Sequence, residues 1–158
     1  MVQRAVLKMG HPTLRQMAAR VTEFGTPELA APQIGVGLRV VIFEVRENPR
    51  YPGIAPIPYT VLINPVITPL REQREEGWEG CLSVPGMRGL VPRFRQVRYQ
   101  GFDADGVPID RTVEGFHARV VQHEVDHLDG ILYPERILDL RNFGFEEALL
   151  GQMTPMPD

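Results

Sequence analysis

Apolar and β-branched segments alternate with turn residues through the first two thirds of the chain. Residues 38–45 (LRVVIFEV) predict a strand, and residues 61–63 (VLI) predict a short strand that ends at Asn64-Pro65. Residues 94–102 and 107–113 predict two more strands. The Asp105-Gly106 pair between them favours a hairpin turn.

A helical period begins after Gly115. The apolar residues of 116–128 fall largely at helical spacing, and Gly130 is well placed as the C-terminal stop. Residues 135–150 predict a second, short helix that is interrupted at Gly144. Residues 50–58 hold three prolines and a glycine and predict a loop, whereas the charged residues 71–77 predict a solvated turn or ribbon. Strands first and the main helix late predict an α+β fold.

Composition narrows the class of protein. A chain of 158 residues suits one domain spanning 1–158, and a net charge of −3 argues against a nucleic-acid surface. No apolar run is long enough to span a membrane, and the N-terminus leads into no signal-peptide core, so we expect a cytoplasmic protein. The single cysteine, Cys81, excludes an internal disulfide; it could be buried filler, a nucleophile or a metal ligand.

The strongest chemical signal is His123-Glu124-Val125-Asp126-His127. On a helix, positions i and i+4 project from one face, so two imidazoles can bind one metal ion while Glu124 acts on a water beside it. The alternative is a surface turn with two unrelated histidines. A catalytic metal also needs a third protein ligand. No histidine follows His127, which points upstream for that ligand.

Upstream motifs give the chain a resemblance to a known family. Glu79-Gly80-Cys81-Leu82-Ser83, followed by the late HExxH segment, is similar to the peptide deformylase family, and Leu29-Ala30-Ala31-Pro32-Gln33-Ile34-Gly35 matches part of a third family motif. The three motifs stand in the family's order, and the resemblance covers most of the chain. It implies mixed or antiparallel sheets packed around a central helix that carries the HExxH segment.

The resemblance also implies a site and a reaction. Cys81 joins His123 and His127 as metal ligands, and Glu124 is the general base. The backbone N–H of Leu82 and the side chain of Gln33 stabilise the oxygen of the formyl group. The implied substrate is the N-formyl-methionyl end of a nascent peptide, and formate is released. The implied ion is Fe²⁺, with Zn²⁺, Ni²⁺ or Co²⁺ as substitutes.

Nearby residues have two interpretations each. Trp78, Phe116 and Val120 could line an apolar pocket for the substrate methionine, or they could be ordinary core residues. Glu79 is expected to pair with Arg93 and hold the Cys81 loop. Asp126 either orients a ligand histidine or faces solvent.

One segment departs from the family pattern. Glu28 stands where the family has a glycine, and no helix-length segment separates residues 21–24 from the Gln33 motif. Either the protein lacks a helical segment near residues 25–30, or the sequence omits a stretch before Ala30. We favour omission, because loss of a packed helix would expose a large apolar surface.

Three functions are therefore weighed. The leading hypothesis is a peptide deformylase. A different HExxH metallohydrolase, such as a peptidase, is disfavoured because no downstream ligand is present. A non-catalytic deformylase homologue is supported only by the altered glycine motif. Ribosome association fits the substrate, although no basic docking segment is visible, and the sequence does not indicate an oligomeric state.

Overall fold

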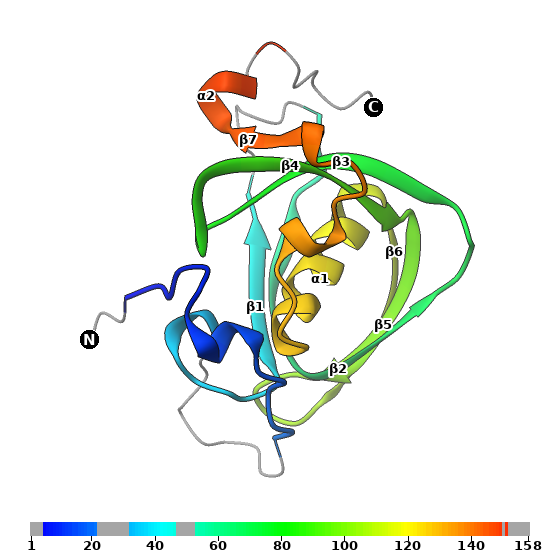
Figure 1. The fold of residues 1–158 in the computed structure, drawn as a ribbon. Coiled ribbons are helices and arrows are strands. Elements are labelled where there is room, and N and C mark those ends of the chain that lie inside the picture. The colour runs from blue at the N-terminus through cyan, green and yellow to red at the C-terminus, as the bar shows by residue number, and fades with distance from the viewer. Residues whose placement is uncertain (1–4, 22–31, 47–52, 150, 152–158) are drawn as a thin grey trace.

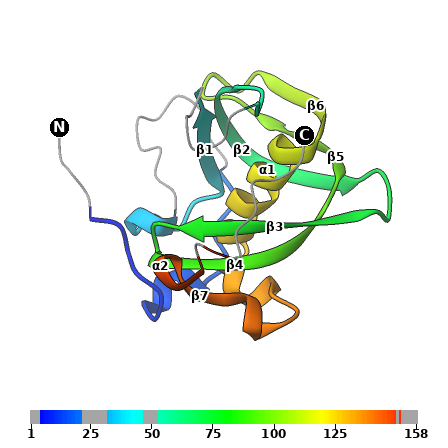
Figure 2. The same ribbon diagram turned by 90° about the horizontal axis from the view of Figure 1, so that it is seen from above.

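The structure, a computed structural model, describes residues 5–21, 32–46, 53–149 and 151. Two antiparallel sheets flank one long helix, α1 (Gly115–Leu128), which lies between them (Figures 1 and 2). No helix in these residues is long and apolar enough to cross a membrane. The central helix between sheets agrees with the α+β fold predicted from the sequence.

The first sheet has four strands in the order β1-β2-β5-β6. Their bounds are β1 (Val40–Val45), β2 (Ile57–Pro69), β5 (Gln96–Phe102) and β6 (Pro108–Glu114). Apolar side chains of this sheet pack on α1 and bury Leu62, Val97, Tyr99 and Val121 completely. The core between sheet and helix therefore fixes which face of α1 is left for the site.

The second sheet has the order β3-β4-β7, with β3 (Arg74–Cys81), β4 (Val84–Phe94) and β7 (Phe143–Phe145). A smaller cluster of Leu14, Val84, Val91, Leu132 and Tyr133 packs beneath it. The chain is completed by short elements: η1 (Pro12–Arg15), η2 (Pro32–Ile34), η3 (Tyr133–Arg136), η4 (Leu140–Asn142) and α2 (Glu146–Leu149).

The end of α1 is tied to the N-terminal segment by backbone. Gly130 follows the helix with φ +73°, a conformation that favours glycine, and a Cβ there would lie 2.7 Å from the carbonyl carbon of Arg15. The N–H of Ala18 donates to the carbonyl of Leu128. These contacts bring η1 to the end of the helix that carries the two histidines, and η2 in turn lies against both η1 and α1.

Most predicted elements are confirmed. The structure has β1, β5 and β6 near the predicted ranges, the turn at residues 103–106, the helix from Gly115 to Leu128, and its stop at Gly130. The charged residues 71–77 form a turn and then the start of β3, which is consistent with the predicted ribbon.

Three predictions are wrong. The strand predicted to stop at Asn64 continues to Pro69, because Asn64 takes φ 50° and the register shifts there without ending the strand. The helix predicted over 135–150 is instead η3, η4, β7 and α2, because Gly144 lies in β7 and pairs with Arg88. The predicted loop over 50–58 ends earlier, since β2 begins at Ile57.

The structure also contains β4, for which the sequence predicted no strand. One further prediction, the missing helical segment near 25–30, falls outside the described residues.

Candidate metal centre

Strand β3 and helix α1 bring three donor residues together. Cys81 is the last residue of β3, and His123 and His127 lie one turn apart on the face of α1 that meets it. One ligand atom from each lies within 4.8 Å of the others. His127 is buried, with 3% exposure, and the other two are half-buried.

The donor set fits a tetrahedral metal ion. Such an ion lies about 2.3 Å from a thiolate sulfur and about 2.0 Å from an imidazole nitrogen, which separates these donors by about 3.5 Å. Cys81 Sγ and His127 Nε2 are 3.5 Å apart. Sulfur with two imidazoles suits zinc, iron, nickel or cobalt rather than magnesium or calcium.

Glu79 binds the ring nitrogen of His123 that points away from the other donors. Its Oε2 lies 2.8 Å from His123 Nδ1, which leaves Nε2 as the nitrogen available to an ion. Arg93 binds both oxygens of Glu79, at 2.9 and 3.0 Å, so the predicted Glu79–Arg93 pair is confirmed. Both side chains are 5% exposed.

Asp126 takes neither of its two predicted roles. It is buried and accepts hydrogen bonds from Arg93 and Arg136, and no histidine contact is found for it in the described part of the chain. The carboxylate that orients a ligand histidine is therefore Glu79.

The buried ion pairs keep Glu79 charged. Burial alone would raise its pKa, but hydrogen bonds from His123 and Arg93, together with their charges, outweigh burial and lower the pKa to about 2. A charged Glu79 keeps accepting the Nδ1 proton of His123.

The surroundings of Cys81 favour the thiolate, which is the form that binds a metal ion. Burial would raise the pKa of Cys81, but hydrogen bonds and charge from His123 and His127 lower it to about 6. Burial would lower the pKa of His123, and hydrogen bonds to Cys81 and Glu79 raise it to about 10. A bound ion takes the place of the proton shared between thiolate and imidazole.

Gln33 reaches the same centre from η2. Its Nε2 donates to Cys81 Sγ at 3.3 Å and to Ser83 Oγ at 3.0 Å. Leu82 follows Cys81 in the turn between β3 and β4. Its apolar side chain would suit a core, yet it is 75% exposed, so only its backbone can take part in the site.

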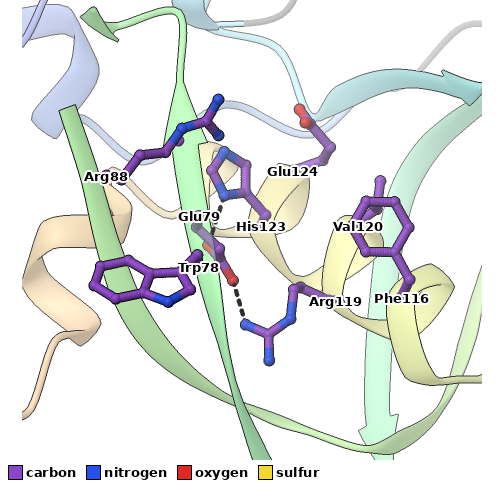
Figure 3. Close-up of a pocket in the computed structure, with 9 residues that line it drawn as sticks. Trp78, Glu79, Arg88, Phe116, Arg119, Val120, His123 and Glu124 are labelled. Carbon is purple, nitrogen blue, oxygen red and sulfur yellow. Dashed lines mark hydrogen bonds and ion pairs between the residues drawn. The ribbon is translucent and has the colours of Figure 1, made fainter. Parts of the chain in front are cut away.

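A cavity of about 160 Å³ opens beside the donors (Figure 3). Trp78, Phe116 and Val120 all line it, and Glu124 stands at its edge next to His123. Phe116 and Val120 also pack against the core, so both of their predicted interpretations describe them in part.

Several neighbours of the site were missed from the sequence. Arg88 and Arg119 line the cavity, Ser83 binds Gln33, and the Tyr133 ring stacks on His123 with centroids 6.2 Å apart. Arg119 had a usable signal, because it lies four residues before His123 and must share its helix face. Ser83 had a signal too, because it belongs to the Cys81 motif, whereas nothing local marks Arg88 or Tyr133.

An HExxH helix facing a strand that ends in cysteine defines a class of metal-dependent hydrolase. The polypeptide deformylase family model matches residues 11–143. This chain belongs to the polypeptide deformylase family.

Individual relatives agree with this assignment. Peptide deformylase 1 of Nitrosomonas europaea is 60% identical, with 98% of this chain and 99% of the relative covered, and peptide deformylase 1 of Bordetella pertussis is 53% identical, with 98% of each covered. A crystal structure of class I type b peptide deformylase from Acinetobacter baumannii with Met-Ala-Ser bound has a TM-score of 0.80 at 37% identity, covering 86% of this chain and 99% of that one.

The predicted family, fold and enzyme class are thus confirmed, as is dependence on a metal. The alignment with the Nitrosomonas europaea enzyme spans 174 positions, more than the 158 residues of this chain, so positions of that enzyme have no counterpart here. That these positions form a helical segment near residues 25–30 stays a prediction.

Proposed function

We propose that this chain removes the formyl group from N-formyl-methionyl ends of newly made polypeptides, with an ion held by Cys81, His123 and His127. The observation that carries the proposal is the convergence of these donors within 4.8 Å beside a cavity that Glu124 lines. Hydrolytic deformylation is the activity of the family to which the chain belongs.

We infer ferrous iron as the ion, because the resemblance to the peptide deformylase family implies it. Zinc, nickel or cobalt are substitutes, since one thiolate and two imidazoles suit all four ions. When bound, the ion supplies Lewis acidity, which polarises the formyl oxygen and makes water more acidic. Cys81 and His127 are buried or half-buried, so the ion's charge is poorly screened by solvent.

Glu124 acts first as general base and then as general acid. It lies next to His123 on α1 and lines the cavity, so its carboxylate can accept a proton from the attacking water. The same group then returns that proton to the nitrogen of the leaving amine. The products are formate and a free methionyl amino terminus.

Gln33 and Leu82 stabilise the formyl oxygen as it gains negative charge. The Gln33 amide already donates toward the sulfur of Cys81, at 3.3 Å, so its N–H groups face the reacting centre. The backbone N–H of Leu82 follows the metal ligand directly in the chain. Two such donors are the arrangement that stabilises an oxyanion.

The cavity beside Glu124 takes the methionine side chain. Trp78, Phe116 and Val120 supply apolar walls, and a cavity of about 160 Å³ is of a size that suits one side chain. We further propose that the enzyme works in the cytoplasm on nascent chains, near the ribosome.

The test is formate release from a formyl-methionyl tripeptide by anaerobic, iron-loaded protein. We expect turnover by the parent and a loss of about 10²–10⁴-fold in kcat for Glu124→Gln, at unchanged metal content. Glu72→Gln, at an exposed carboxylate that does not line the cavity, is the matched control.

Each alternative predicts a different result. Cleavage of internal peptide bonds regardless of the formyl group would indicate a peptidase. Tight binding of the formylated peptide without formate release would indicate a non-catalytic homologue, and either outcome would contradict the proposal.

A further inference from the structure

Arg119 is a buried cation in the wall of the substrate cavity. It lies one turn before His123 on α1, is 5% exposed, and lines the cavity with Phe116 and Val120 (Figure 3). Burying a guanidinium is costly unless its donors are paired, so its bonds show what it holds in place.

The guanidinium of Arg119 joins the helix to both strands of the β3–β4 hairpin. Nη1 donates to Glu79 Oε1 at 2.9 Å and to the carbonyl of Val91 at 2.8 Å, and Nη2 donates to the carbonyl of Glu75 at 2.6 Å. The planar fork of arginine directs donors on two separate nitrogens to these three acceptors, whereas lysine would present all of its donors from one nitrogen.

Two arginines therefore fix one carboxylate. Glu79 Oε1 accepts from both Arg93 Nε and Arg119 Nη1, and Glu79 Oε2 is left to face Arg93 Nη2 and His123 Nδ1. Without Arg119, Arg93 would still bind both oxygens of Glu79, but Oε1 would lose one of its two donors, and the Arg93–Glu79 pair would be free to shift together. The His123 ring would turn with it, because its Nδ1 follows Oε2.

The guanidinium of Arg119 occupies the space that a side chain at position 77 would need. A Cβ at Gly77 would lie 2.7 Å from Arg119 Cζ and 2.8 Å from its Nε and Nη2. Gly77 has no positive φ that would call for glycine on backbone grounds. The three atoms nearest to such a Cβ all belong to the Arg119 guanidinium, which its own hydrogen bonds hold in place.

We propose that Arg119 is a positioning residue: acting through Glu79, it sets the orientation of the metal ligand His123, and Gly77 is required to accommodate it. The inference rests on the proposed metal centre. It also means that the substrate cavity and the metal share one buried side chain, so that a change in the cavity wall is transmitted to the metal.

The test compares Arg119→Leu, Arg119→Lys and Gly77→Ala with the parent, each loaded with Co²⁺. We expect Arg119→Leu to weaken Co²⁺ binding about tenfold, the low end for residues that support ligand histidines, and to shift the thiolate-to-cobalt absorption band. kcat for a formyl-methionyl peptide should fall similarly. Arg119→Lys should recover part of each effect.

Gly77→Ala should reproduce these changes when Arg119 is present and have little effect in the Arg119→Leu background. Gly37→Ala, where a Cβ would meet nothing within 4 Å, and Arg98→Leu, an exposed arginine on β5, are matched controls and should resemble the parent.

The proposal is overturned if Arg119→Leu changes only KM or thermal stability and leaves the cobalt spectrum and affinity unchanged. Equal effects of Gly77→Ala in both backgrounds would also overturn it. If Arg119→Leu does not fold, Arg119→Lys and Gly77→Ala are judged by the same criteria. If the parent releases no formate, the proposed function fails, while the cobalt spectra still decide the role of Arg119.

Discussion

Cys81 lies between two imidazoles, and this position sets its acidity. Hydrogen bonds and charge from His123 and His127 lower its pKa to about 6 against the opposing effect of burial. A thiolate at neutral pH is both a good ligand and a good nucleophile, so its reactivity depends on whether an ion is bound.

Removal of the metal should expose that nucleophile. In chelator-treated protein, we expect the alkylation rate of Cys81 by iodoacetamide to rise with a midpoint near pH 6, because the thiolate fraction rises through the pKa; an ordinary cysteine has its midpoint near 8.5. Mass spectrometry of time points gives the rate, and reloading with Zn²⁺ should protect Cys81. A midpoint near 8.5 in the metal-free protein would contradict this account.

Residue by residue, the sequence predicted the proposed metal ligands better than the residues that hold these ligands in place. His123 and His127 follow from helical spacing, and the upstream Cys81 follows from its motif. The partners of Glu79 were only half foreseen: Arg93 lies fourteen residues along the chain, but the contact with Arg119 depends on how the helix packs across the hairpin. Such contacts between distant segments have no local signature.

At the scale of elements, β2 shows how one residue can join two pairings. Its first half pairs with β1 and its second half with β5, and the register shifts between Ile63 and Val66. Asn64 lies at this shift with φ 50°, and its side chain binds both backbone groups of Val21, with Oδ1 2.9 Å from N and Nδ2 2.8 Å from O. The bulge therefore also anchors the N-terminal segment.

Asn64→Ala should lower the free energy of unfolding by about 2–4 kcal/mol. Two hydrogen bonds are lost, and alanine is strained in the left-handed backbone conformation that Asn64 adopts. Asn64→Gly loses the same bonds but tolerates the backbone, so it should be the more stable of the two. Urea unfolding followed by circular dichroism measures both. An alanine variant as stable as the glycine variant would show that the φ of Asn64 carries no cost.

The missed strand β4 has an identifiable cause. Pro85 and Pro92 suggest a loop in sequence, because proline cannot donate within a sheet. In the structure, β7 pairs only with residues 87–89 of β4, so both prolines lie beyond that short pairing, where a missing N–H breaks no bond to β7. The other strands were predictable from their β-branched and apolar composition, and the helix from the period of its apolar residues.

In the molecule as a whole, an ion at the proposed site would add a further link between parts that already meet through packing and through the hydrogen bonds of Arg119. Cys81 belongs to the β3-β4-β7 sheet, whereas the histidines belong to α1, which packs mainly on the other sheet. An ion at this junction stabilises the native state relative to the unfolded state by mass action.

Chelation should therefore lower Tm. At free Co²⁺ about a hundred times Kd, binding adds about 2.7 kcal/mol, which for a domain of this size corresponds to a shift on the order of 5–10 °C. Differential scanning calorimetry with and without metal gives the value. His127→Ala should show no metal-dependent shift, and a shift retained in that variant would place the ion elsewhere.

The sequence separation of the ligands has a kinetic consequence. Cys81 and His127 are 46 residues apart in the sequence. The three donors therefore come together only after helix α1 has packed against the β3–β4 hairpin. We therefore expect the ion to bind late and to stabilise a contact that forms after the folding transition state. Metal should therefore leave the refolding rate nearly unchanged and lower the unfolding rate. The metal-loaded enzyme should then stay folded for longer than the metal-free protein.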